Sequence, residues 1–147
     1  MALRRSVLEL IGPFDEVLDA GTPTRSGGDH DMFTRILLAG YRIEYEPAAI
    51  VWHRHRREWR ELLDTVRGYG TGVYAHLTRH LLHGETRPVR VALGWLRWQL
   101  GALLRAPLGA EGRRTRQLGL AELRGCAEGP AAFFRARRLA SVARREP

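Results

Sequence analysis

A glycine-rich loop with two aspartates, residues 21–33, holds the side chains with the clearest capacity for chemistry. Asp29 comes directly before an apolar run with helical spacing, where the capping residue of a helix belongs. A carboxylate held at such a position faces outward at the mouth of a flexible loop whose glycines allow the backbone to come close to a ligand. Spacing alone also fits a surface loop whose aspartate only caps the helix.

Two further polar residues follow in the same predicted helix. Asp31 and Arg35 are four residues apart, so they share a helix face and are expected to pair. A role for Asp31 in binding a substrate is the alternative to this pairing. His30 is expected to be solvated rather than catalytic.

Two histidines, His53 and His55, lie two residues apart in a basic run. On an extended chain they project to the same side, and imidazole is a common ligand of divalent transition metals. The same two histidines fit equally well in a solvated basic surface segment. The spacing of the other residues suggests no further metal-ligand cluster, and one or two histidines cannot hold a metal alone.

The elements that must position these residues are mostly helical. Hydrophobic periodicity and breaker residues predict two short strands in the middle of the chain, at the edge of a mixed sheet, and an α+β fold that is otherwise helical. The strands are Tyr41–Tyr45 and Ala49–Trp52, and the helices are 2–11, 31–39, 58–82, 88–106, 115–126 and 130–144.

Glycines and a proline modify the predicted helices. Gly68, Gly70 and Gly72 lack the preceding strand and the spacing of a nucleotide-binding loop, so they indicate a kink or close packing on another helix. Gly129 and Pro130 are expected to separate the last two helices.

Composition fits one domain or part of one. The chain has 147 residues, 44% of them hydrophobic, and a net charge of +8. All 24 basic residues are arginines, and residues 66–147 hold fifteen of them against five acidic residues. Such a basic half suits an anionic surface, but it shows no groove-reading pattern for nucleic acid. The tryptophans and arginines of 88–106 fit either a helix lying flat on a membrane or a buried one.

Short segments along residues 1–81 resemble, in their order and spacing, the acceptor-side half of a family 2 glycosyltransferase of the GT-A type. The matching segments are Leu3–Asp15, Gly21–Pro23, Gly27–Phe33 with Arg35, Ala39–Ile43, Tyr45–Pro47 and Trp52–His55. The resemblance implies an acceptor-side part at residues 1–57 and a basic helical extension at 58–147.

The resemblance also implies roles for individual residues. Asp29 takes the place of the catalytic base, although glycine stands at position 28 where the family usually has glutamate. The implied substrate-binding residues are Gly27, Gly28, Asp31 and Arg35. His53 matches a histidine that helps an Asp-x-Asp motif to hold Mg²⁺ or Mn²⁺. The implied partners are a nucleotide-sugar donor and a glycan or lipid-linked acceptor.

The donor-binding half with its Asp-x-Asp motif has no counterpart in the sequence. We therefore expect a glycosyltransferase fragment that is inactive alone, in the cytoplasm or on the inner face of the plasma membrane. The alternative is a non-catalytic basic helical protein that associates with an anionic membrane surface or a partner.

Overall fold

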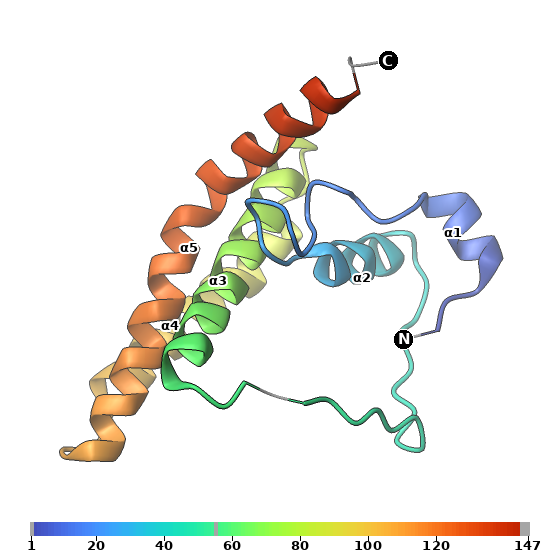
Figure 1. Ribbon diagram of the computed structural model, residues 1–147. Helices are drawn as coiled ribbons and strands as arrows, with labels where there is room; N and C mark the ends of the chain where they lie inside the picture. The colour runs from blue at the N-terminus through green and yellow to red at the C-terminus, as the bar shows by residue number, and fades with distance from the viewer. Residues whose placement is uncertain (1, 55, 145–147) are drawn as a thin grey trace.

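The computed structural model describes residues 2–54 and 56–144, and this part of the chain folds into five helices joined by loops (Figure 1). The helices are α1 (Arg5–Ile11), α2 (Gly28–Leu38), α3 (Trp59–Leu82), α4 (Arg87–Leu104) and α5 (Ala110–Ala143). Four of the predicted helices, 2–11, 31–39, 58–82 and 88–106, are thus confirmed with boundaries that differ by a few residues. Gly40, in a left-handed conformation that glycine adopts readily, follows Ala39 at the end of α2.

The two longest helices, α3 and α5, form the main packing layer and run beside each other (Figure 1). Glycines line their interface: a Cβ atom on Gly70 would lie 2.3 Å from the carbonyl oxygen of Glu122, and one on Gly125 would lie 1.9 Å from that of Arg67. Because these glycines have no side chains, the backbones can approach more closely than larger residues would permit. Of the two interpretations from the sequence, a kink or close packing on another helix, Gly70 therefore fits close packing.

The final helix continues through the predicted break. Pro130 lies inside α5, so the expectation of two helices separated by Gly129 and Pro130 is wrong. Proline removes one helical hydrogen bond and crowds the preceding turn. Gly129, before the proline, packs against the backbone of α3 at Thr71, and Phe133, after it, packs against Ala75 of α3. This packing on both sides of the proline holds the helix together.

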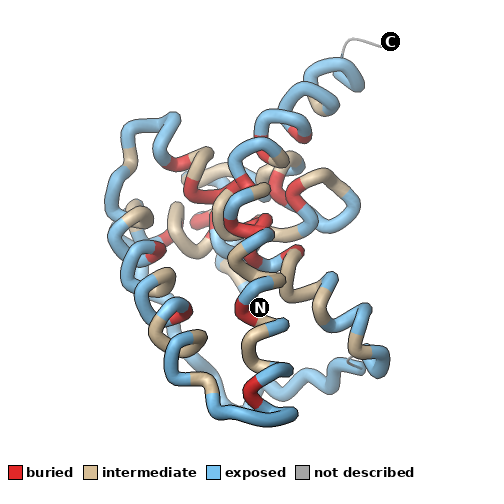
Figure 2. The backbone as a smooth tube through the Cα atoms, turned by 90° about the vertical axis from the view of Figure 1, so that its left-hand side faces the viewer, coloured by how far each residue is buried: buried red, intermediate tan, exposed pale blue. Residues whose placement is uncertain are grey.

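Helices α1 and α2 lie to one side of α3, and small apolar clusters connect the parts. Val7, Met32 and Ile36 pack between α1 and α2. A second cluster joins Leu18 of the intervening loop to Ala75 of α3 and Phe133 of α5. Buried residues are concentrated where these elements meet, as Figure 2 shows, and the outer helix faces are exposed. The expected division at residues 57 and 58 stays a prediction.

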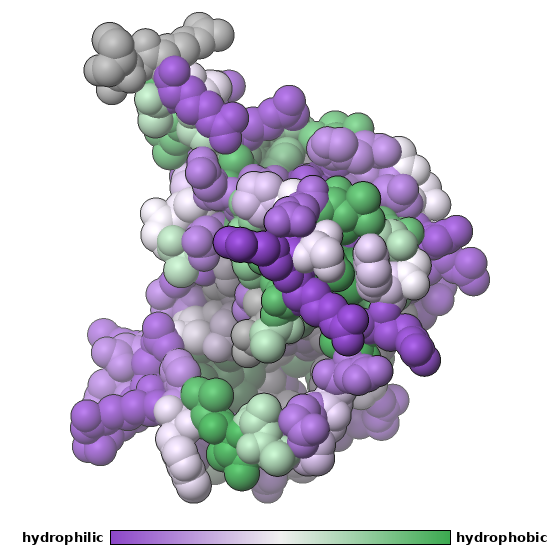
Figure 3. All heavy atoms as spheres, turned by 90° about the vertical axis from the view of Figure 1, so that its right-hand side faces the viewer, coloured by the Kyte–Doolittle hydropathy of each residue, from purple (hydrophilic) through white to green (hydrophobic). Residues whose placement is uncertain are grey.

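The predicted strands are absent from the described residues, so the α+β assignment is wrong and the structure is helical. Residues 41–54 run as an extended loop at the edge of the molecule (Figure 1), with Tyr45 90% and Trp52 94% exposed. Figure 3 views the molecule from this side and shows hydrophobic side chains among hydrophilic ones. The pattern of a strand produces a strand only when a second backbone pairs with it, and no described segment does so.

Helix α4 is the least buried of the long helices, with only Ala92 and Gln99 classed as buried. Val91, Trp98 and Leu104 are exposed. No helix among residues 2–54 and 56–144 is long and apolar enough to cross a membrane. A flat position of this helix on a membrane surface stays a prediction.

The cysteine in the α3–α5 interface offers a direct measure of how tightly the two helices pack. Cys126 is 5% exposed, and burial together with the nearby Glu122 raises its pKa to about 11. Because the thiolate is the reacting form, we expect iodoacetamide at pH 8 to label the native protein at least ~100-fold more slowly than the urea-unfolded chain. Mass spectrometry at successive times measures both rates, and equal rates would contradict the packing.

Candidate functional site

A buried aspartate lies at the centre of the polar interactions between α2 and α3. Asp31, in the first turn of α2, is completely buried. One of its carboxylate oxygens accepts a hydrogen bond from Arg35 Nε at 2.7 Å, and the other is 3.0 Å from both Arg79 Nη1 and His80 Nε2. The predicted pairing of Asp31 with Arg35 is thereby confirmed, while α3 supplies partners that the local spacing did not reveal.

The two arginines also connect this carboxylate to the N-terminal segment. Arg35 donates to the carbonyl oxygens of Ile11 at 2.6 Å and Pro13 at 2.8 Å, and so holds the end of α1. Arg79 donates through Nε to Asp15 at 2.6 Å. These contacts give Arg35 a structural task, and its substrate-binding role stays a prediction.

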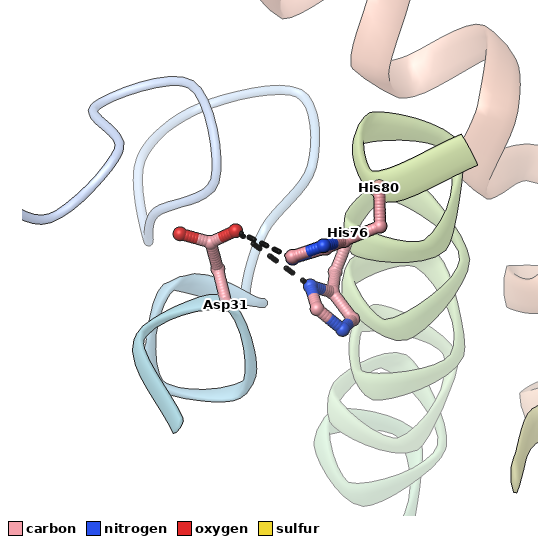
Figure 4. Close-up of side chains that lie close together, drawn as sticks. All are labelled: Asp31, His76 and His80. Atoms are coloured by element: carbon pink, nitrogen blue, oxygen red, sulfur yellow. Dashed lines mark hydrogen bonds and ion pairs between the residues drawn. The ribbon is translucent and has the colours of Figure 1, made fainter. Parts of the chain in front are cut away.

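Two histidines one helical turn apart on α3 face the same carboxylate oxygen. His80 Nε2 is 3.0 Å and His76 Nδ1 is 3.9 Å from Oδ1 of Asp31, and Figure 4 shows both rings turned toward it. The longer distance is not a hydrogen bond, and His76 Nδ1 is buried with no hydrogen-bond partner among residues 2–54 and 56–144. One ligand atom from each of the three residues lies within 4.8 Å of the other two.

This cluster corrects the expectation that the chain holds no further group with metal-ligating potential. The signal was present in the sequence as two histidines four residues apart within a predicted helix, a spacing that places both on one face. The two histidines were overlooked because apolar residues at helical spacing dominate the pattern of the same helix. The contribution of Asp31 had no local signal, because it lies 49 residues before His80.

Burial and charge set the protonation states in this cluster. Burial alone would raise the pKa of Asp31, but the two imidazoles and the charges of Arg79 and Arg35 outweigh it and hold the pKa well below its usual value. Burial, reinforced by His80, lowers the pKa of His76 against the opposing effect of Asp31. The carboxylate is therefore ionised and His76 neutral at neutral pH.

The predicted base, Asp29, has a contrasting environment. It is the second residue of α2 and is exposed, and no hydrogen bond or ion pair of its side chain occurs among the described residues. Gly27, rather than Asp29, is the capping residue of the helix, so that part of the expectation is wrong. The left-handed conformation of Gly27 redirects the chain into α2 without any side-chain cap.

The glycines before Asp29 have packing reasons for their small size. A Cβ atom on Gly27 would lie 2.7 Å from the carbonyl oxygen of Gly72 on α3, and one on Gly28 would lie 2.8 Å from that of Leu18. A glutamate at position 28, as in the family pattern, would therefore require the loop to shift. Substrate binding by Gly27 and Gly28 stays a prediction.

The predicted metal ligand, His53, lies in a separate place. It is exposed and lines a cavity of about 380 Å³ with Arg25, Arg56 and Asp64, among others, and Asp29 is not among the lining residues. Asp64 is ion-paired with Arg25. The same cavity is also lined by a second carboxylate, that of Glu61, and by the two arginines, whose positive charges oppose the binding of a Mg²⁺ or Mn²⁺ ion. His55 lies outside the described residues, and the role of His53 stays a prediction.

A larger, mostly apolar groove adjoins the buried cluster. It has a volume of about 820 Å³ and lies between α2, α3 and α4, with His76 in its wall. His30 and Thr34 line it from α2, and Thr34 Oγ1 is 3.3 Å from His76 Nε2. His76 thus lies at the boundary between the buried cluster and the groove.

The comparisons with known proteins point to one enzyme class. Two curated proteins described as pre-mycofactocin glycosyltransferase, from Mycobacterium tuberculosis strains CDC 1551 / Oshkosh and ATCC 25618 / H37Rv, are each 31% identical to this chain over 102 residues. No protein-family model and no solved structure significantly matches. The similarity covers 67% of this chain, and the chain spans about a fifth of the length of either relative.

Proposed function

We propose that this chain is the acceptor-side part of a glycosyltransferase, which moves a sugar from a nucleotide-sugar donor to an acceptor hydroxyl. The observation that carries the proposal is the 31% identity to a glycosyltransferase over two thirds of the chain. Membership of family 2 and the GT-A type rests on the order of short segments from Leu3 to His55, described above.

Asp29 is the proposed general base. In the reaction, the acceptor oxygen bonds to the anomeric carbon as its proton passes to the Asp29 carboxylate, and the nucleoside diphosphate leaves with the electrons of the broken bond. The exposed position of Asp29 in the first turn of α2 supports this role, because its carboxylate is open to an incoming hydroxyl. Asp31 is unsuited to it, because it is buried away from an incoming hydroxyl and because the neighbouring imidazoles and arginines hold its pKa well below the usual value.

The apolar groove is the proposed acceptor site. His30 follows Asp29 directly in α2 and lines the groove, so an acceptor lying there would have its hydroxyl near the start of the helix. The apolar walls contributed by α4, with Val91 and Trp95 among them, suit a glycan attached to an apolar carrier. The chain alone is expected to give no turnover.

The test is an Asp29→Asn change in a longer glycosyltransferase that contains this segment. We expect the transfer rate to fall at least ~100-fold, because the amide cannot accept the proton, with little change in thermal stability at this exposed site. Asp19→Asn, the same change at another exposed aspartate, is the matched control and should leave the rate unchanged. An unaltered rate in Asp29→Asn would remove Asp29 from the mechanism.

The alternative, a non-catalytic protein on an anionic membrane surface, has weaker support. It rests on the arginines of residues 66–147 and on exposed apolar side chains of α4 such as Trp98. Neither curated relative is described as a membrane-binding protein. We therefore favour sugar transfer.

A further inference from the structure

We propose that Asp31, His76 and His80 form a binding site for a transition-metal ion of the zinc type. The site is independent of the proposed transfer reaction and of the Mg²⁺ or Mn²⁺ ligand role predicted for His53. It consists of two imidazoles from one turn of α3 and one carboxylate from the first turn of α2, all three buried.

The geometry needs only a small adjustment to hold an ion. The three ligand atoms lie within 4.8 Å of one another, whereas ligand atoms around a tetrahedral zinc ion with bonds of 2.0–2.1 Å are separated by about 3.3 Å. Histidines four residues apart on a helix, joined by a carboxylate from another element, are a known zinc-ligand arrangement that leaves the fourth position open. Side-chain rotations that move the ligand atoms by about an ångström therefore bring all three atoms to bonding distance from one ion.

An unsatisfied atom points into the same site. His76 is 4% exposed as a residue, and in the part of the chain that the structure describes its Nδ1 has no hydrogen-bond partner, although it faces Asp31 Oδ1 at 3.9 Å. A buried polar atom without a partner costs free energy and calls for an explanation. A metal ion between this nitrogen and the carboxylate would supply the missing partner.

The surrounding charges permit a cation. Arg35 and Arg79 contribute two positive charges, and Asp31 together with Asp15, which accepts from Arg79 Nε at 2.6 Å, contributes two negative ones. The formal charges of these four groups sum to zero, so together they do not repel an incoming cation. Arg79 Nη1 shares Asp31 Oδ1 and has to yield part of this contact when an ion binds.

The donor set selects the kind of ion. Two imidazole nitrogens and one carboxylate oxygen suit Zn²⁺ and Co²⁺, whereas Mg²⁺ and Ca²⁺ require oxygen ligands. The groove of about 820 Å³ that His76 lines provides the route of entry. The ion would join α2 to α3 at the place where Asp31 already joins them.

The test uses the full chain, freed of metal with EDTA and then dialysed against Zn²⁺ or Co²⁺ alone. We expect uptake of about one ion per chain, a visible Co²⁺ absorption band of tetrahedral character, and a rise of the melting temperature in Zn²⁺ but not in Mg²⁺. A wild-type chain that takes up no zinc overturns the proposal without any variant.

Two variants locate the ion. His76→Leu removes a ligand and an unsatisfied atom together, so it should remain folded while its zinc affinity falls on the order of 100-fold or more. His83→Gln, at an exposed histidine just after α3, should bind as the wild type does. If His76→Leu binds zinc unchanged, the ion lies elsewhere and the proposal fails. If that variant does not fold, His80→Gln takes its place under the same criterion.

Discussion

Replacing Asp31 with asparagine is expected to lower the free energy of unfolding by about 3–5 kcal/mol, measured without metal in urea or by heating. The carboxylate is completely buried and is the shared partner of Arg35, Arg79 and His80. An amide of the same shape keeps the volume but leaves the two largely buried guanidinium groups short of a counter-charge. Helices α1, α2 and α3 all depend on these contacts, so the loss should appear in the global transition.

The matched control is the same substitution in an exposed ion pair. Asp64 pairs with Arg25 at the surface, with side chains 59% and 36% exposed, so Asp64→Asn should cost less than about 1 kcal/mol. A loss in Asp31→Asn as small as that of the control would show that the buried cluster does not hold α2 against α3.

A single added methyl group at Gly125 is expected to destabilise the fold by about 3 kcal/mol or more, near the upper end of the usual range for overpacking. The Cβ atom of Gly125→Ala would lie 1.9 Å from the carbonyl oxygen of Arg67 and 2.9 Å from the amide nitrogen of Thr71. These are backbone atoms within α3 and cannot rotate away, so the two helices have to separate. The separation should also speed the alkylation of the neighbouring Cys126.

Gly94→Ala in α4 tests whether the effect belongs to the interface. Apart from its chain neighbours and the nearby backbone of its own helix, no atom of the described residues lies within 4 Å of the Cβ position of this helical glycine. Alanine there should stabilise the protein by about 0.5–1 kcal/mol, because it loses less backbone entropy on folding. If chemical denaturation gives the two variants equal stability, α3 and α5 do not pack through Gly125.

The sequence predicted features that depend on near neighbours in the chain. Apolar residues at helical spacing located α3 and α4, because a helix that buries one face repeats its apolar residues about every 3.6 positions. The Asp31–Arg35 pair was likewise readable from four-residue spacing. Pro130 misled the same reasoning, because propensity is local while the continuity of α5 comes from its packing on α3.

What only the tertiary structure decided involves residues distant in the chain. Tyr41–Tyr45 and Ala49–Trp52 alternate like strands, but a strand also needs a paired backbone, and the described chain supplies none. Spacing did not show which of the two aspartates, Asp29 or Asp31, is buried. Folding buries Asp31 against His76, His80 and Arg79 and leaves Asp29 at the surface, since helical geometry turns successive side chains to different sides and only one side faces α3.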